Sequence, residues 1–184
     1  MSEPIKPVRR IVTIDDADGK SLAVEDAPSP DVRTDPARPG YASTRVWVTT
    51  ASPPRIEKRF RDALLLPQMM VPPPRGSLCR IVTIPPDASW RRKVGAADVV
   101  AFFVAMGAPR ASIHSPSAPH PYMQKTSTLD FCLILEGEVT LVLDTEEVAL
   151  AAGDTVVQRG TNHAWSNRSD KPCRIAISSH DAAE

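Results

Sequence analysis

The sequence predicts an all-β domain, a barrel or sandwich of short strands with one short helix. Short runs rich in Val, Ile and Thr recur along the chain, and Gly, Pro, Asn and Asp separate them. The last third is densest in such runs and holds no helical pattern, which argues against a parallel α/β sheet. Proline is frequent, at 19 of 184 residues. The prolines lie between the runs, as in a β protein with long, stiffened connections.

Length, charge and cysteine content narrow the class of protein. A chain of 184 residues suits one domain with a sizeable core. The 22 basic and 22 acidic residues cancel, and this balance argues against a nucleic-acid partner. No apolar run approaches a membrane span and no signal-peptide pattern opens the chain, so we expect a cytoplasmic protein with no membrane partner. Cys79, Cys132 and Cys173 lie in apolar runs, and we expect buried free thiols.

Residues 1–75 are expected to supply N-terminal strands and proline-rich connectors that pack on a barrel or on a partner subunit. The predicted elements are a hairpin of residues 8–14 and 21–25 with a turn at Asp18-Gly19, a connector over 27–40, a strand over 42–50 and an irregular segment over 52–74. Within the connector, Arg33, Asp35 and Arg38 are expected to face solvent, with ligand contact as the alternative.

Residues 76–184 are expected to form the barrel, within a single structural domain overall. A strand over 76–84 is followed by a helix over 96–106, where four apolar residues recur at helical spacing. That stripe predicts core packing, with a lid over a pocket as the alternative. After a loop over 111–122, the predicted strands cover 129–135, 138–143, 147–151, 155–158, 163–167 and 173–179.

Residues 153–167 carry the most informative pattern. Glycine turns at Gly153 and Gly160 flank an apolar run, and His163 and Trp165 then share one face of an alternating strand. A histidine that enters a barrel just after a glycine turn is a common way to place a metal ligand or a proton-transfer group in a pocket. The residues that lie opposite His163 therefore decide what it can do.

The motifs around His163 resemble those of the cupin superfamily, small jelly-roll barrels defined by two motifs. The second motif normally has a glycine, Pro-x-Gly, a histidine and an asparagine, and here Gly160, His163 and Asn167 match it, with Gln158 at the proline position. In the first motif, Gly137 is present and Asp130 lies where glutamate is usual. The segment 158–165 and Leu-Glu-Gly-Glu at 135–138 resemble one subgroup of small bacterial and fungal cupins, of the cupin 2 conserved-barrel type. The resemblance implies a cupin barrel, or double-stranded β-helix, with an N-terminal β extension.

A typical cupin metal is held by two histidines and a carboxylate from the first motif and a histidine from the second. By position, the resemblance carries these places to Gln124, Thr126, Asp130 and His163. Two of the usual ligand positions have lost their histidines, so the resemblance implies a degenerate metal site. If Fe, Mn or Zn binds here, the expected ligands are His163, Asp130 and Gln124.

Several roles for these residues remain open. In the leading hypothesis the protein is a lyase- or isomerase-type enzyme. It moves a proton on a small apolar oxygenated metabolite, in an isomerisation, cyclisation, dehydration or decarboxylation. His163 is then the acid or base, and Asp130 orients it. The expected substrate contacts are Gln124, Thr126, Cys132, Trp165 and His120.

The same residues also suit a metal-dependent dioxygenase or lyase, a non-catalytic small-molecule-binding protein, or a buried hydrogen-bonded network. We expect Trp165 and Phe131 to pack in the barrel, with substrate stacking as the alternative, and His120 also suits a solvated or locally bonded loop. We also expect a homodimer, with residues 8–50 partly lining the subunit interface or exchanging a strand.

Overall fold

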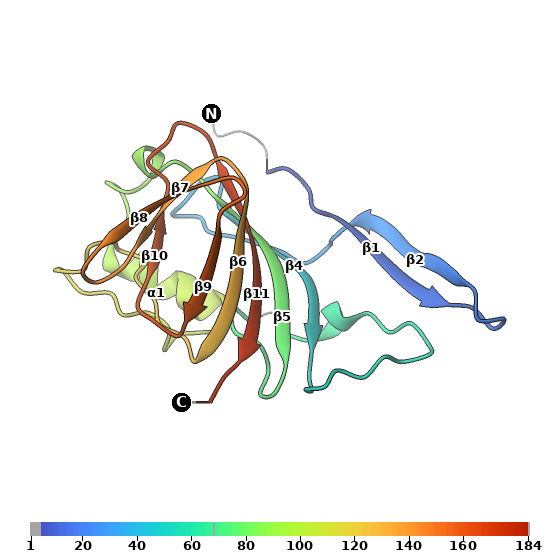
Figure 1. The fold of residues 1–184 in the computed structure, drawn as a ribbon. Helices are drawn as coiled ribbons and strands as arrows, with labels where there is room; N and C mark the ends of the chain where they lie inside the picture. The colour runs from blue at the N-terminus through green and yellow to red at the C-terminus, as the bar shows by residue number, and fades with distance from the viewer. Residues whose placement is uncertain (1–4, 68, 184) are drawn as a thin grey trace.

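The computed structural model describes residues 5–67 and 69–183. Eleven strands, one α-helix and two 3-10 turns follow one another in these residues (Figure 1). The strands are β1 (Arg9–Asp15), β2 (Ser21–Pro28), β3 (Val32–Thr34), β4 (Ala42–Thr49), β5 (Ser77–Ile84), β6 (Thr128–Glu136), β7 (Glu138–Val142), β8 (Glu147–Ala151), β9 (Thr155–Arg159), β10 (Ala164–Ser166) and β11 (Cys173–Asp181). The helix is α1 (Ala96–Ala105), and the 3-10 turns are η1 (Ala63–Leu65) and η2 (Asp87–Ser89).

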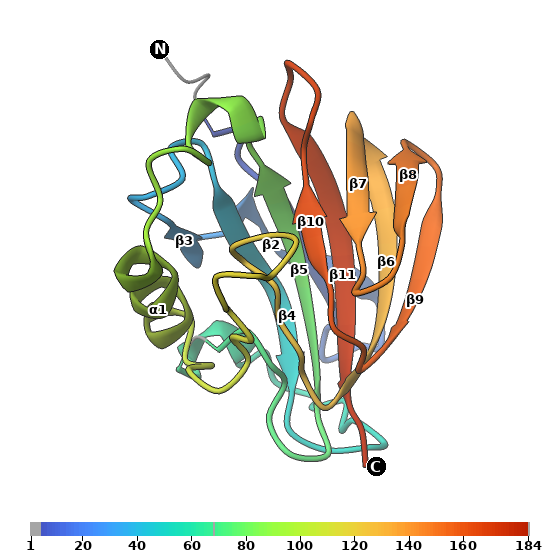
Figure 2. The same cartoon turned by 90° about the vertical axis from the view of Figure 1, so that its left-hand side faces the viewer.

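Two sheets form the barrel. The larger has six strands in the order β3-β4-β5-β11-β6-β9, and the smaller has three in the order β10-β7-β8. Every paired neighbour in these sheets is antiparallel, as a jelly-roll connectivity requires. Figure 2 shows the smaller sheet facing the half of the larger sheet that carries β11, β6 and β9. The predicted all-β barrel with one short helix is therefore confirmed. The division at residue 75 stays a prediction, although β4 lies in the same sheet as β5.

Strand alternation explains which side chains fill the barrel. Along β11, Cys173, Ile175 and Ile177 are buried while the residues between them are partly exposed. β5 and β6 show a similar period, and their buried residues Val82, Ile84, Cys132 and Ile134 join one apolar core. Cys132 and Cys173 are buried free thiols and Cys79 is a partly buried one, in line with the sequence prediction. Burial raises the pKa of Cys132 and of Cys173 to about 12, so both thiols stay protonated and unreactive.

The helix α1 packs against the barrel through the stripe that the sequence predicted. Val99, Phe102, Phe103 and Met106 are all buried in the same core cluster. The Asp98 carboxylate accepts a hydrogen bond from the backbone N–H of Gly95 at 2.8 Å and so caps the first turn. In Figure 2 the helix lies to one side of the two sheets, beside the end of the larger sheet that carries β3 and β4. No helix in the described part of the chain is long and apolar enough to cross a membrane.

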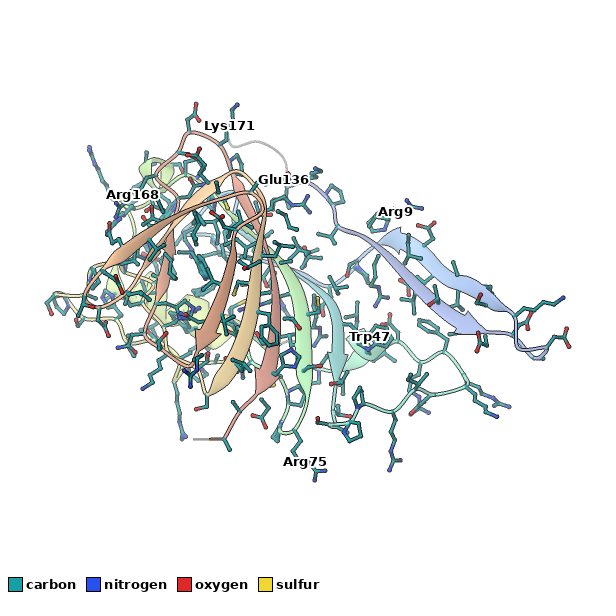
Figure 3. All side chains as sticks on the ribbon, viewed as in Figure 1. Arg9, Trp47, Arg75, Glu136, Arg168 and Lys171 are labelled. Carbon is teal, nitrogen blue, oxygen red and sulfur yellow. The ribbon has the colours of Figure 1, made fainter. Side chains whose placement is uncertain are left out.

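The hairpin of β1 and β2 projects away from the barrel (Figure 1). Figure 3 shows Arg9 on this hairpin, outside the barrel, whereas Glu136 and Arg168 lie on the barrel itself. At its base the buried Arg10 donates to Glu25 at 2.6 Å and to Asp62 at 3.0 Å, which ties the hairpin to the segment before η1. Its strands pair only with each other, so the predicted hairpin is confirmed as a separate two-stranded sheet.

Three sequence predictions were wrong in this part of the molecule. Asp35 and Arg38 were expected to face solvent, but they are only 4% and 5% exposed because α1 and the loop after it cover them. The connector over 27–40 contains the short strand β3, which pairs with β4. Phe131 was expected to pack inside the barrel, but it is 49% exposed, because its neighbour Asp130 takes the inward face of β6.

Candidate functional site

His163 is fixed by its backbone before its side chain is considered. The His163 N–H donates to the Gln124 carbonyl at 3.0 Å, and the Gln124 N–H donates to the His163 carbonyl at 2.8 Å. This isolated two-residue bridge lies just outside β10 and β6. The chain reaches it through a turn at Gly160, whose φ of +63° favours glycine. A Cβ at Gly160 would also lie 3.1 Å from the carbonyl of Thr126, so this turn tolerates little else.

The hydrogen bonds of His163 define its tautomer. Its Nδ1 lies 2.9 Å from the carbonyl oxygen of Thr161, which can only accept, so Nδ1 carries the proton. Its Nε2 lies 3.0 Å from the amide nitrogen of Gln124, which can only donate, so Nε2 carries the lone pair. Both contacts fit a neutral imidazole. The Thr161 carbonyl therefore provides the orienting hydrogen bond that was expected from Asp130.

The environment keeps His163 uncharged near neutral pH. The side chain is only 3% exposed, and burial lowers its pKa below the usual histidine value. The hydrogen bond to the Thr161 carbonyl and the negative charge of Asp130 raise the pKa, but they do not outweigh burial. The positive charge of Arg80 lowers the pKa further. A neutral imidazole with an unprotonated Nε2 is suited to accept a proton once Gln124 releases that atom.

Several buried polar side chains have unmet hydrogen-bonding capacity, and the charges of two of them, Asp130 and Arg80, act on the pKa of His163. Asp130 on β6 and Gln158 on β9 are direct cross-strand partners, 6% and 4% exposed. Asp130 Oδ1, Gln158 Nε2 and Arg80 Nε are buried without a hydrogen-bond partner in the described residues. Such atoms are costly unless water or a ligand satisfies them. We call Arg80, Gln124, Asp130, Gln158 and His163 the interior polar cluster.

Two hollows lie near this cluster. One is a small interior cavity of about 40 Å³, which has room for a few water molecules. It lies between the larger sheet, α1 and β10, and its polar lining includes Arg38, Arg80, Tyr122 and Gln124. The other is an open cleft of about 610 Å³ at the barrel end, lined by residues 125–129 and 159–162 among others. The interior cavity is the better candidate site, because Gln124 joins it to His163 and buried polar groups line it.

The predicted substrate contacts do not all lie in one place. Gln124 and Trp165 line the interior cavity, and the Trp165 ring lies 6.0 Å from the ring of His163. Thr126 lines the open cleft instead, and its hydroxyl is hydrogen-bonded to that of Thr128 at 2.7 Å. Cys132 is buried in the apolar core.

His120 lines neither hollow. It is fully buried, its Nδ1 accepts from the backbone N–H of Tyr122, and its ring packs edge-on against Trp90. Its Nε2 lies 3.8 Å from the carboxylate of Asp87. Asp87 in turn accepts from Ser166 at 2.6 Å. This group is a buried structural network that joins η2 to the strand β10. Of the two loop readings for His120, local bonding agrees with the structure and solvent exposure does not.

The residues at the cupin metal positions do not make a ligand set. No group of three or more His, Cys, Asp or Glu side chains in the described residues is placed to hold a metal ion. Of the four positions, only His163 and Asp130 carry strong donors. Gln124 presents its amide N–H₂ to His163, and Thr126 is turned toward Thr128. Two donors fall short of the three or more that Fe, Mn or Zn sites use.

Three residues of this site were not identified from the sequence. Arg80 lies in a run that was recognised as a strand, but its inward direction was not deduced. Gln158 was noted only as the residue at a proline position, and Arg38 was expected to face solvent. A basic residue within an apolar strand is a usable signal, because charged side chains rarely enter a barrel without a partner.

Comparisons with known proteins found similarity to a known domain family in the C-terminal part of the chain. Residues 113–179 match the family model described as Cupin domain. Phomopsin biosynthesis cluster protein C' of Diaporthe leptostromiformis is 52% identical over 48 residues, which is 26% of this chain and 25% of that protein. Oryzines biosynthesis cluster protein J of Aspergillus oryzae is 46% identical over 50 residues, which is 27% of this chain and 28% of that protein. These matches therefore span about a quarter of the length of the curated relatives.

Among solved structures, a Cupin 2 conserved barrel domain protein from Salinispora arenicola is similar to this chain. The TM-score is 0.43 at 16% sequence identity, covering 88% of this chain and 92% of that chain.

Proposed function

From the match of residues 113–179 to the Cupin domain model, we propose that this chain is an enzyme that transfers a proton on a small, largely apolar, oxygenated metabolite. The observation that carries the proposal is the neutral, buried side chain of His163. Its Nδ1–H donates to the Thr161 carbonyl, and its Nε2 lone pair accepts from Gln124, which lines the interior cavity. The reaction is an isomerisation, cyclisation, dehydration or decarboxylation. Relatives named for the phomopsin and oryzines biosynthesis clusters support a biosynthetic role.

In this proposal each residue of the site has a defined task. His163 accepts the proton at Nε2 and later returns it. When it becomes an imidazolium, its Nδ1–H bond to the Thr161 carbonyl strengthens and the charge of Asp130 stabilises it. In the free protein the Gln124 amide donates a hydrogen bond to His163 Nε2, and Gln124 also lines the cavity. It must therefore move aside when substrate reaches His163. The buried walls, including Trp165, exclude water.

Proton transfer is tested by isotope exchange, which works even when the substrate is unknown. Purified protein is incubated in D₂O with a panel of small oxo- and hydroxy-compounds, and deuterium uptake is followed by mass spectrometry. We expect uptake into at least one compound class, and loss of that uptake in His163→Asn. Full uptake in His163→Asn removes the histidine from the reaction. Uptake that requires an added transition metal favours a metal-dependent dioxygenase or lyase instead.

We also propose that the chain assembles as a homodimer through the projecting hairpin. Ile11 and Leu22 on the hairpin are 52% and 42% exposed. On the barrel, Phe131 on β6 and Val157 on β9 are 49% and 58% exposed, and they are direct cross-strand partners. Two exposed apolar faces on one chain support mutual burial between two copies.

A further inference from the structure

We propose that the interior cavity is a carboxylate-binding site in which Arg38 and Arg80 hold the anionic end of a small organic acid. Both arginines line the cavity, and both are more than nine-tenths buried, at 5% and 7% exposed. Arg38 Nη2 and Arg80 Nε have no hydrogen-bond partner in the described residues. Two buried guanidinium groups with unused donors in one cavity call for an acceptor that the chain does not supply.

Arg38 is held in place before any ligand arrives. Its Nε donates to the Asp35 carboxylate at 2.6 Å, and the Tyr122 hydroxyl donates to the same carboxylate oxygen at 3.0 Å. The guanidinium lies 3.5 Å from the centre of the Tyr122 ring and 4.1 Å from that of the Tyr41 ring. These contacts occupy Nε and the faces of the guanidinium and leave Nη2 unused. A donor fixed in this way loses little conformational entropy when a ligand binds.

Arg80 is the cavity arginine whose charge no ion pair offsets in the described residues. Asp35 forms an ion pair with Arg38 and offsets its charge. The Arg80 side chain forms no ion pair, and its Nε makes no hydrogen bond, within the described ranges 5–67 and 69–183; the nearby Asp130 also has an unpartnered oxygen. A carboxylate supplies one negative charge and two acceptor oxygens in a plane, which suits the planar donor face of a guanidinium.

The size of the cavity limits what can enter. About 40 Å³ accommodates a carboxylate and its adjoining carbons, but it is far below the several hundred Å³ of a pocket for a whole drug-sized molecule. The rest of the lining, including Val82, Ile177 and Trp165, is mainly apolar. The ligand is therefore a small acid, or the carboxylate end of a larger one, with an apolar chain beside the charged group.

The position of Gln124 connects this site with the proposed reaction. Gln124 lines the cavity and also donates to His163 Nε2. An acid held by the arginines thus places its first carbons beside the Gln124–His163 pair. This assignment of the substrate class rests on the proposed function, whereas carboxylate binding itself is independent of any reaction.

Binding is tested by calorimetry on the full chain with propionate and benzoate. Propionamide serves as the neutral match of propionate, and phosphate as a different oxyanion. We expect the wild-type protein to bind the carboxylates and to bind propionamide at least about tenfold more weakly, a difference of about 1.4 kcal/mol. Absence of carboxylate binding, equal affinity for the amide, or tighter binding of phosphate each overturns the proposal.

Variants separate a ligand-binding arginine from a structural one. We expect Arg80→Gln to weaken propionate binding at least about tenfold, and Arg110→Gln, at an exposed position, to leave it unchanged. Arg80→Met removes a buried cation without protein partners, so its melting temperature should equal or exceed that of wild type. A large drop in that temperature shows that Arg80 is structural and overturns the proposal.

The two tests fail independently. Carboxylate binding without deuterium uptake refutes the proposed proton transfer and leaves the binding site intact. Deuterium uptake into neutral compounds, with no carboxylate binding, refutes only the carboxylate site.

Discussion

Folding stability should fall steeply as the pH drops from 7 to 5.5, because two histidines are buried in the uncharged form. His120 and His163 are 0% and 3% exposed, and burial lowers the pKa of each below its ordinary value of 6.5. Once unfolded, both titrate near that ordinary value. The unfolded state then binds more protons than the folded state, so stability decreases as the pH falls through about 6.5.

The size of this effect follows from proton linkage. If a histidine stays neutral in the folded protein, lowering the pH from 6.5 to 5.5 favours unfolding by about 1 kcal/mol. Two such residues give a loss of up to about 2 kcal/mol, which corresponds to a decrease of about 4–8 °C in melting temperature for a chain of this size.

The assay is urea unfolding followed by tryptophan fluorescence between pH 7.0 and 5.5. His163→Asn removes one titrating group, so its stability loss over this range should be about half that of wild type. His120→Asn should behave in the same way. Comparing the loss between two pH values within each variant cancels any constant effect of the substitution. A stability that does not change down to pH 5.5, or a full loss in both variants, refutes the assignment of neutral buried histidines.

Three further predictions concern the metal positions, the structural network and the dimer. Gln124→His restores a histidine beside His163 and Asp130, and should raise the affinity for Zn²⁺, measured by calorimetry, at least about tenfold. A wild-type protein that already holds stoichiometric metal contradicts the assignment of a degenerate site. Asp87→Ala leaves Ser166 without its acceptor and should cost about 2–4 kcal/mol in urea unfolding; a loss below about 0.5 kcal/mol shows that the network carries little stability. Phe131→Glu should convert a dimer to a monomer in analytical ultracentrifugation, and a wild-type monomer would rule out the assembly.

Much of the fold could be predicted from local patterns. The alternation of apolar and polar residues located most strands, and the spacing of Val99, Phe102 and Phe103 identified the buried face of α1. Glycine turns around Gly160 indicated where His163 enters the barrel. These features depend on neighbours a few residues away, so a single sequence contains them.

The orientation of faces was harder to predict. On β6 both faces carry apolar residues, so alternation alone does not say which face points inward. Asp130 and Phe131 are adjacent and cannot share a face, and the structure turns Asp130 inward. A polar residue within an apolar strand was here the better indicator of the functional face, because it marks where a partner is needed.

The burial of Arg38 could not be predicted from its surroundings in the sequence. Its neighbours are prolines and charged residues, which are typical of an exposed connector. The aromatic rings that cover it come from Tyr41 nearby and from Phe102 and Tyr122, which are distant in the chain. Long-range contacts of this kind appear only when the fold is known.

The protonation state of the His163 imidazole decides whether this residue can act as the proposed base. Long-range ¹H–¹⁵N correlation spectra of the protein between pH 6 and 8 report which ring nitrogen carries the proton. We predict a neutral ring with the proton on Nδ1, held by the Thr161 carbonyl, and an unprotonated Nε2. A ring protonated on Nε2, or on both nitrogens at pH 7, would contradict the proposed proton transfer, because no lone pair would then be free to accept the substrate's proton.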